Sequence, residues 1–127
     1  MVKAQKNFYI GIEVTLDVIA GKWKPLILCL IGTGIDRNGQ LLRAIPAISQ
    51  KVLTQQLNQL IEDDILTKEV FAETPPHVEY HFTEHGESLR PLLLGLCKWG
   101  EAHATQCPQR DTLITPPVSL ATLKTQL

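Results

Sequence analysis

The sequence predicts a mainly helical domain with one small β-hairpin, an α+β fold. Three observations lead to this prediction. Helical periodicity runs through several segments before residue 65, two short alternating segments then flank a pair of prolines, and a leucine-rich segment with helical spacing follows. A chain of 127 residues is long enough for one such domain with a modest core.

Two helices are predicted in the first third of the chain. The first spans residues 12–20, where apolar residues recur at helical spacing: Ile12, Leu16 and Ile19. The second is WKPLILCLIG, residues 23–32, whose apolar residues surround the helix axis, so we expect it to be buried. Pro25 is tolerated in its first turn, and Gly32 and Gly34 end it.

A short turn separates the next two predicted helices. The third helix spans residues 39–45, with Asp36 or Asn38 as its cap, and Pro46 stops it because a residue before proline avoids the helical conformation. Ser49 then caps a fourth helix by accepting an amide hydrogen bond from the first turn. The core-facing stripe of this helix is predicted to be Leu53, Leu57, Leu60 and Ile61.

The opposite side of the fourth helix carries long side chains rich in hydrogen-bond donors, and no acid precedes Glu62 on it. These side chains are Gln50, Lys51, Thr54, Gln55 and Asn58. Such a surface suits water, as the polar back of any amphipathic helix does. It also suits a partner that presents both charge and base edges.

The periodicity changes after residue 64. Residues 65–71 and 77–82 alternate as strands do, and the turn AETPP between them makes a two-stranded hairpin. Thr83 caps a final long helix to about Gln106, in which Gly86 and Pro91 predict a bend in the first turns. Its apolar side is predicted to be Leu89, Leu92, Leu93, Leu96 and Trp99.

The charge of the chain is unevenly distributed, although the net charge is only −1. Residues 21–57 hold five basic residues and one acid, which gives +4, whereas residues 58–127 hold five basic residues and ten acids, which gives −5. This asymmetry is typical of a protein in which one face meets a polyanion. Uneven charge without such a partner is the alternative.

Three helices, a short turn, a fourth helix, a hairpin and a last helix follow one another as in a winged helix-turn-helix. In that fold the fourth helix enters the major groove, where Gln reads adenine and Lys reads guanine or binds phosphate. We predict base contacts from Ser49, Gln50, Lys51, Thr54 and Gln55, with Asn58 on the same face. For phosphate contacts we predict Lys22, Lys24 and Arg43, with Pro76 and His77 on the hairpin.

Three stretches resemble the HxlR-type transcriptional regulators, a winged-helix group related to MarR. They are LDVIAGKWKPLIL (16–28), LLRAIPAISQKVLTQQLNQLIEDDIL (41–66) and PPHVEYHFTEHG (75–86), and the resemblance extends from about Ile12 to Trp99. It implies a homodimeric bacterial or archaeal repressor or activator that binds double-stranded DNA at an inverted-repeat operator. The fourth helix would read the DNA, the hairpin would be the wing, and the first and last helices would form the dimer interface.

The chain departs from the family pattern at three places. Ile10 and Gly11 stand where the family usually has cysteine and proline, so the redox chemistry of that cysteine is not carried over. The third helix lacks the usual aromatic residue and one of two arginines, and keeps Arg43. His77 replaces the usual wing arginine, so its contact with DNA would be weaker and would depend on pH. The effector is left open as a small molecule, a thiol or none.

We divide the chain into an N-terminal arm (1–11), a winged-helix DNA-binding and dimerisation domain (12–106) and a flexible tail (107–127). A short helix over 118–127 is a further expectation. No apolar run approaches the ~18 residues of a membrane span, and no signal peptide is recognisable. Three widely spaced cysteines argue against a disulfide framework and for a reducing compartment, which predicts a cytoplasmic protein.

The sequence offers little support for a metal site or an active site. His77, His81 and His85 are spaced by four, and His103 and Cys107 form a further pair, but without a CxxC or HExxH motif we predict no metal and no cofactor. The chain has no phosphate-binding glycine loop and no nucleophile elbow, so we predict no catalytic residues. A winged helix used only for protein contacts, and a thiol switch at Cys97 or Cys107, remain alternatives.

Overall fold

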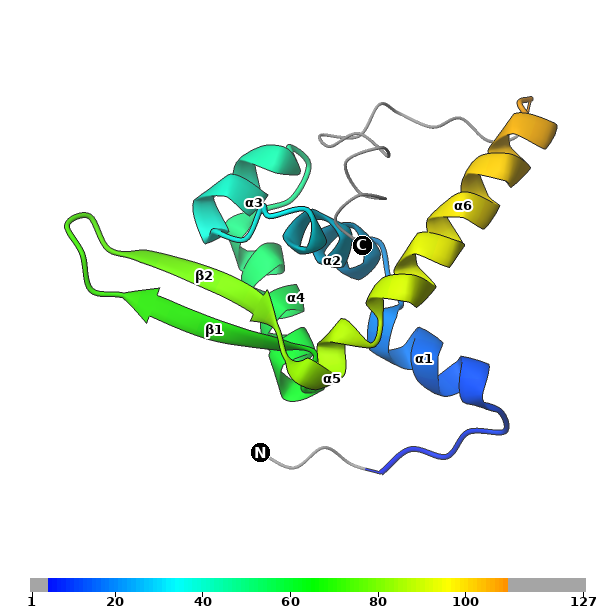
Figure 1. The fold of residues 1–127 in the computed structure, drawn as a ribbon, viewed down its shortest axis with the longest axis horizontal. Helices are drawn as coiled ribbons and strands as arrows, with labels where there is room; N and C mark the ends of the chain where they lie inside the picture. Colours follow the sequence, from blue (N-terminus) through cyan, green and yellow to red (C-terminus); the bar gives the residue numbers. More distant parts are fainter. Residues whose placement is uncertain (1–4, 110–127) are drawn as a thin grey trace.

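The computed structural model describes residues 5–109. Within this range the chain forms six helices and one two-stranded antiparallel sheet (Figure 1). The elements are α1 (Gly11–Ile19), α2 (Lys24–Gly32), α3 (Asn38–Ala44), α4 (Gln50–Glu62), β1 (Leu66–Phe71), β2 (His77–Phe82), α5 (Glu84–Glu87) and α6 (Arg90–Gln106). The predicted fold class is therefore confirmed, and the helix predicted over 118–127 lies outside the described residues.

A single apolar core joins α2, α3, α4, the base of the hairpin and the start of α6. The stripe predicted for α4 is largely confirmed: Leu53, Leu57 and Leu60 are fully buried, and Ile61 packs half-buried against the same core. The apolar run of α2 is buried as well, and Cys29 is half-buried beside it. Burial of these side chains fixes how α4 lies on the domain and leaves its opposite face in solvent.

The hairpin, called the wing below (residues 66–82), pairs from Leu66 with Phe82 to Phe71 with His77. The connection between α2 and α3 lies against its second strand as a short third segment. Arg37 forms an isolated bridge with Glu79, and the Tyr80 amide donates a 2.8 Å hydrogen bond to the Asp36 carbonyl. The wing is thereby fastened to the chain just before α3.

Two predicted helix caps are confirmed and one is wrong. The Ser49 hydroxyl accepts a hydrogen bond from the Val52 amide at 3.2 Å, and the Thr83 hydroxyl accepts one from the Gly86 amide at 2.8 Å. Arg37 occupies the cap position of α3 and makes no side-chain cap bond there. Asn38 is the first residue of the helix rather than the residue before it. Asp36 lies two residues before the helix, and its carbonyl accepts a hydrogen bond from the Tyr80 amide of the wing.

The long helix predicted from Thr83 is in fact two helices, α5 and α6, that break at Ser88 and Leu89. Pro91 has no amide hydrogen to donate to the Glu87 carbonyl, so an α-helix cannot run through this point. Gly86 adds a second constraint. A Cβ at this position would lie 2.1 Å from the Ile65 carbonyl oxygen, so α5 packs its backbone directly on the chain that enters β1.

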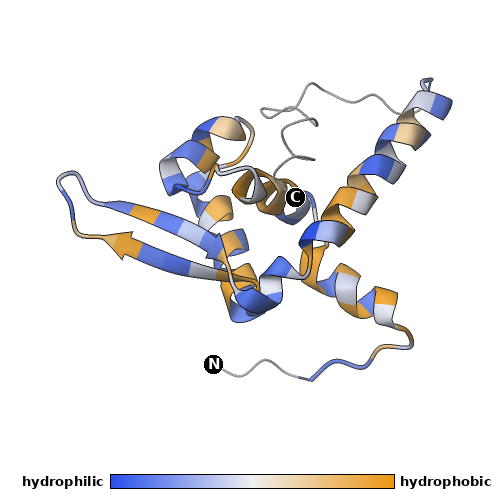
Figure 2. Cartoon of the chain, in the orientation of Figure 1, coloured by the Kyte–Doolittle hydropathy of each residue, from blue (hydrophilic) through white to orange (hydrophobic). Residues whose placement is uncertain are grey.

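Helices α1 and α6 diverge from the body at one end of the molecule, and the wing projects at the other end (Figure 1). Both helices carry apolar residues on their surfaces, as the orange segments of Figure 2 show. The exposed large apolar residues of α1 and its approach are Phe8, Tyr9, Ile10, Ile12, Val14 and Leu16, and those of α6 are Leu92, Leu96 and Trp99. Within residues 5–109, no helix combines the length and apolarity that a membrane crossing requires.

Candidate nucleic-acid interface

The turn between α3 and α4 is anchored in the core, and this sets the direction of α4. Ile45 and Ile48 are both buried, and the Ile48 amide donates a 3.1 Å hydrogen bond to the Ile45 carbonyl. Pro46 and Ala47 between them are exposed. The turn is therefore held by two side chains in the core, and α4 begins at the surface immediately after it.

The side chains predicted to read bases lie together on the exposed face of α4. Ser49, Gln50, Lys51, Thr54, Gln55 and Asn58 are all exposed. This set is called the reading face below. No acidic residue occurs in the sequence between Asp36 and Glu62, so the reading face carries donors, neutral amides and positive charge only. Such a surface complements phosphates and the acceptor atoms of base edges.

A hydrogen-bonded network organises the start of the reading face. The amides of Asn38 and Gln50 pair reciprocally, at 2.9 Å and 3.1 Å, and the Gln50 Nε2 also donates to the Thr54 Oγ1 at 2.9 Å. Asn38 belongs to α3, so this network ties the two helices together at the surface. The role of Asn38 was not predictable, because nothing in a spacing of 12 residues indicates a contact with Gln50.

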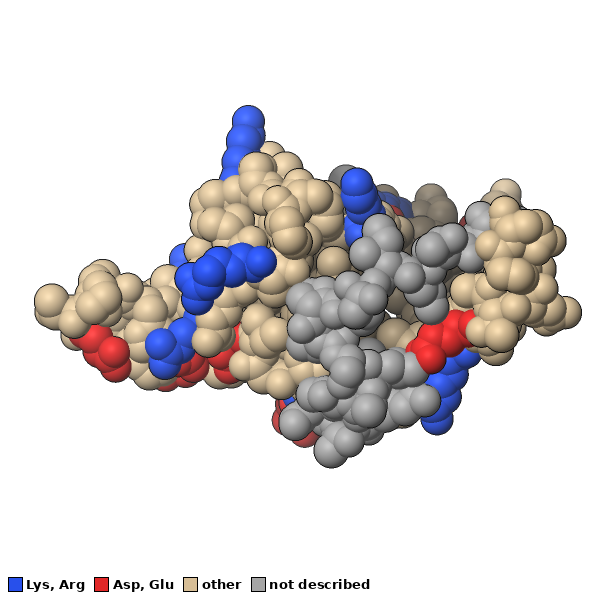
Figure 3. Space-filling model, turned by 90° about the horizontal axis from the view of Figure 1, so that it is seen from above, with Lys and Arg blue, Asp and Glu red and all other residues tan. Residues whose placement is uncertain are grey.

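The predicted phosphate ligands of the helical part differ in exposure. Lys51, Arg43 and Lys22 are exposed, and the Lys22 ammonium lies 4.7 Å from the centre of the Trp23 ring. Lys24 is only 8% exposed, which does not favour the predicted phosphate contact. It starts α2 within the body of the domain. In Figure 3, basic side chains project from the helical body, whereas acidic ones gather along the wing at the left.

The predicted wing contacts also separate. Pro76 is exposed at the tip, but the His77 side chain is only 18% exposed and is held by its own hairpin. Its Nδ1 lies 3.4 Å from a Glu73 oxygen, its Nε2 lies 3.0 Å from a Glu79 oxygen, and its ring stacks on Phe71 at 4.5 Å. His77 therefore does not project from the wing, contrary to our expectation for a phosphate ligand.

The thiols predicted as a switch lie on α6, away from the reading face. Cys97 is half-buried and lies beside Cys29 of α2. Burial, and in the same direction the neighbouring Cys97 thiol, raise the pKa of Cys29 to about 12. A raised pKa disfavours the reactive thiolate. Cys107 ends α6 and is half-buried. A thiol switch at Cys97 or Cys107 stays a prediction.

Known proteins share this arrangement. Residues 18–108 match the family model of HxlR-like helix-turn-helix proteins. The HTH-type transcriptional regulator YtcD of Bacillus subtilis (strain 168) is 46% identical over 99 residues, which cover 78% of this chain and 79% of YtcD. YkvN, a second HTH-type transcriptional regulator of that organism, is 46% identical over 101 residues, which cover 80% of this chain and 86% of YkvN.

A solved structure agrees with these sequence matches. The redox regulator HypR in its reduced form superposes with a TM-score of 0.72 at 40% identity, covering 77% of this chain and 97% of the HypR chain. The matched region contains the α3–turn–α4 unit and the wing. YtcD and YkvN are both named as transcriptional regulators, and neither is named as an enzyme.

Proposed function

The chain belongs to the HxlR-like helix-turn-helix family of transcriptional regulators, and from this premise we propose that it acts as a homodimer on an inverted-repeat operator. The observation that carries the proposal is the reading face of α4, which is exposed, free of acids and fixed to the core by its buried leucines. A protein that acts on chromosomal DNA works where that DNA is, which supports the predicted cytoplasmic location.

Base contacts are assigned to the reading face and phosphate contacts to its basic neighbours. Gln50 and Gln55 have amide groups that can bond adenine in the major groove, and Lys51 can bond guanine or phosphate. Arg43 and Lys22 are also exposed and supply further positive charge at the surface. Among residues 5–109, Lys51 has no acidic partner, so its charge is available to a polyanion.

The homodimer is supported by the apolar residues that α1 and α6 expose. Trp99 is 69% exposed and Ile12 is 66% exposed, and they lie on the two helices that diverge at the same end of the molecule (Figures 1 and 2). Monomeric proteins rarely expose contiguous apolar surface of this kind. A second copy of the chain that covers both helices would bury it, and a two-fold axis is the commonest way to do so.

A two-fold dimer would present two reading faces related by the same axis. Each would occupy the major groove of one half-site, and the half-sites would lie about one helical turn apart, ~34 Å. The operator would then be an inverted repeat, because its symmetry follows that of the protein. This part of the proposal depends on dimerisation through α1 and α6.

The DNA-binding test is selection of a random-sequence duplex pool on the purified full chain at two salt concentrations. We expect enrichment of a two-fold-symmetric site, with affinity that falls steeply as salt rises. Recovery of no motif, with weak retention that ignores sequence, would contradict the proposal. It would favour instead a winged helix used only for protein contacts.

The dimerisation test compares two substitutions of exposed apolar residues by glutamate. Leu96→Glu places a charge on α6 (Leu96 is 49% exposed), and Val70→Glu is the matched control on the wing (Val70 is 64% exposed). Light scattering after gel filtration should give a dimer for the wild type and the control, and a monomer for Leu96→Glu. A dimer that survives Leu96→Glu would place the interface elsewhere.

A further inference from the structure

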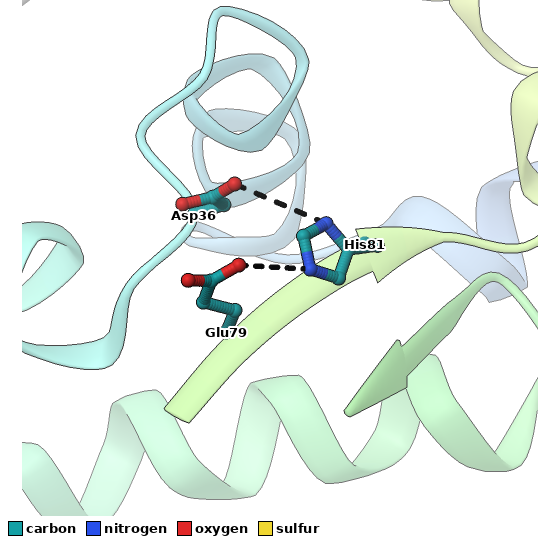
Figure 4. Close-up of side chains that lie close together, drawn as sticks. All are labelled: Asp36, Glu79 and His81. Atoms are coloured by element: carbon teal, nitrogen blue, oxygen red, sulfur yellow. Dashed lines mark ion pairs between the residues drawn. The ribbon is translucent and has the colours of Figure 1, made fainter. Parts of the chain in front are cut away.

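We propose that Asp36, Glu79 and His81 form a site for a divalent transition-metal ion that fastens the wing to the segment before α3. The proposal goes beyond DNA binding and does not depend on it. One ligand atom from each of the three residues can be chosen so that all lie within 4.8 Å of one another. The three side chains converge from two segments of the chain (Figure 4).

Backbone contacts hold the two segments together before any ion binds. Glu79 and His81 are two residues apart on β2, so they project from the same face of the hairpin. Asp36 lies on the α2–α3 connection, and its carbonyl accepts the 2.8 Å bond from the Tyr80 amide. The donor atoms are therefore placed by the fold, which lowers the ordering cost of binding an ion.

The distances lie close to those that an ion requires. His81 Nε2 is 3.2 Å from Glu79 Oε1, and His81 Nδ1 is 3.9 Å from Asp36 Oδ2. Two donors on one tetrahedral zinc ion are about 3.3 Å apart, as bond lengths of ~2.0 Å dictate. Each ring nitrogen faces a different carboxylate (Figure 4), and one of them lies within 4.8 Å of a carboxylate oxygen of both Asp36 and Glu79.

The carboxylates around His81 favour a bound cation. A third carboxylate, Glu69, lies 3.6 Å from His81 Nε2, and Glu69 pairs directly with Glu79 across the two strands. Like charges in opposed positions of a sheet are destabilising. A protonated imidazole has only two N–H groups for three carboxylates. Arg37 at 3.7 Å and His77 at 3.0 Å both lie at Glu79 Oε2, whereas Glu79 Oε1 faces His81, and a divalent ion there would balance the carboxylates.

The donor set indicates the class of metal. One imidazole nitrogen with two carboxylates suits zinc and its first-row neighbours, whereas calcium and magnesium prefer oxygen donors alone. The site also has an entry path, because Asp36 and His81 line an open pocket of about 470 Å³. Histidine spacing in the sequence does not indicate these ligands, because Asp36 comes from another segment of the chain.

The test is calorimetric titration of the metal-stripped full chain with zinc chloride, repeated with calcium chloride. We expect one zinc ion per chain on the wild type and no saturable binding of calcium. His81→Ala and Asp36→Asn should each weaken zinc binding at least about tenfold, a loss typical for groups around a metal. His85→Ala, which removes an exposed histidine of α5, is the matched control and should bind zinc as the wild type does.

Two further arms make the result decisive. Thermal unfolding should show a zinc-dependent rise in Tm for the wild type and for His85→Ala, and none for Asp36→Asn, whose shape is that of the wild-type residue. Asp36→Asn therefore decides the matter if His81→Ala does not fold. The proposal is overturned if zinc binds both variants as tightly as the wild type, or if binding disappears only in Cys107→Ser.

Discussion

The reading face of α4 and the wing use their polar side chains in opposite ways. On α4, Lys51, Gln55 and Asn58 are exposed, and Lys51 has no acidic partner among residues 5–109. The hydrogen-bonded network at the start of the helix orients the Gln50 amide. On the wing, His77 and His81 are each surrounded by carboxylates of their own hairpin and its support. One surface is free for a partner, and the other is engaged with itself.

The sign of the charge differs as well. The wing holds Lys68 against Glu69, Glu73 and Glu79, whereas no acid lies between residues 36 and 62. An acidic hairpin repels phosphate, so we expect DNA affinity to reside in the helix-turn-helix. The contribution of a wing to DNA-binding energy therefore depends on its side chains and does not follow from the fold alone.

The largest effect is expected at Gly86, where α5 packs on the residue before the wing. Gly86→Ala would place a Cβ 2.1 Å from the Ile65 carbonyl oxygen, at the point where the wing leaves the core. We expect the free energy of unfolding to fall by about 3 kcal/mol, the upper range for overpacking. Chemical denaturation followed by circular dichroism measures it.

The control for this prediction is Gly11→Ala, because a Cβ at Gly11 meets no atom within 4 Å. Its unfolding free energy should stay within about 0.5 kcal/mol of the wild type, as for an ordinary surface substitution. If Gly86→Ala were equally neutral, the close packing of α5 on the start of β1 would be wrong.

The network at the start of the reading face gives the next effect. Gln50→Ala removes the amide that Asn38 orients and should reduce discrimination between operator and altered half-sites by ~1–3 kcal/mol. Asn38→Ala keeps the Gln50 amide but removes the partner that orients it. The loss of discrimination in this variant should therefore be smaller. Competition binding with single-base operator variants measures both. An equal or larger loss in Asn38→Ala would mean that Asn38 itself contacts the DNA.

The fold was largely predictable, because burial leaves a periodic trace in the sequence. The stripe of α4, the two paired strands of the wing, and the caps at Ser49 and Thr83 all followed from local chemistry. The break before α6 was only partly predictable. Pro91 indicated it, but the packing of Gly86 on Ile65 is a contact between residues 21 apart in the sequence.

The site was less predictable, since exposure and partners are tertiary properties. Lys24 lies one residue after Trp23 in a basic stretch, yet the start of α2 carries it into the body of the domain. His77 was expected to point outward because of its place near the tip. His77 and Glu79 are two residues apart on β2, so their side chains lie on the same face, and the His77 Nε2 lies 3.0 Å from a Glu79 oxygen. Neither outcome is visible from spacing along one segment.

Two lysine variants test whether the reading face or the wing contacts the DNA phosphates. Lys51→Ala removes a cation from the reading face, and Lys68→Ala removes one from the wing, where both residues are exposed. Losing one phosphate contact lowers the slope of log K against log salt by about 0.9, which is about a 3.5-fold change between 50 and 200 mM. We expect that change for Lys51→Ala and a smaller one for Lys68→Ala. Equal slopes for the two variants would place the wing on the DNA backbone.

The smallest effect is expected at His77, where the family resemblance would suggest a contact. Its side chain is 18% exposed and both ring nitrogens face carboxylates, so no donor is left for a phosphate. His77→Ala should change operator affinity less than about twofold and leave the salt slope unaltered, within the near-neutral range of substitutions that touch no partner. Fluorescence anisotropy with labelled operator at several salt concentrations measures both quantities, and thermal unfolding checks that loss of the Phe71 stack has not melted the wing. A tenfold loss of affinity with a lower slope would show that DNA pulls His77 away from Glu73 and Glu79, and the wing would then be a phosphate clamp that is closed in the free protein.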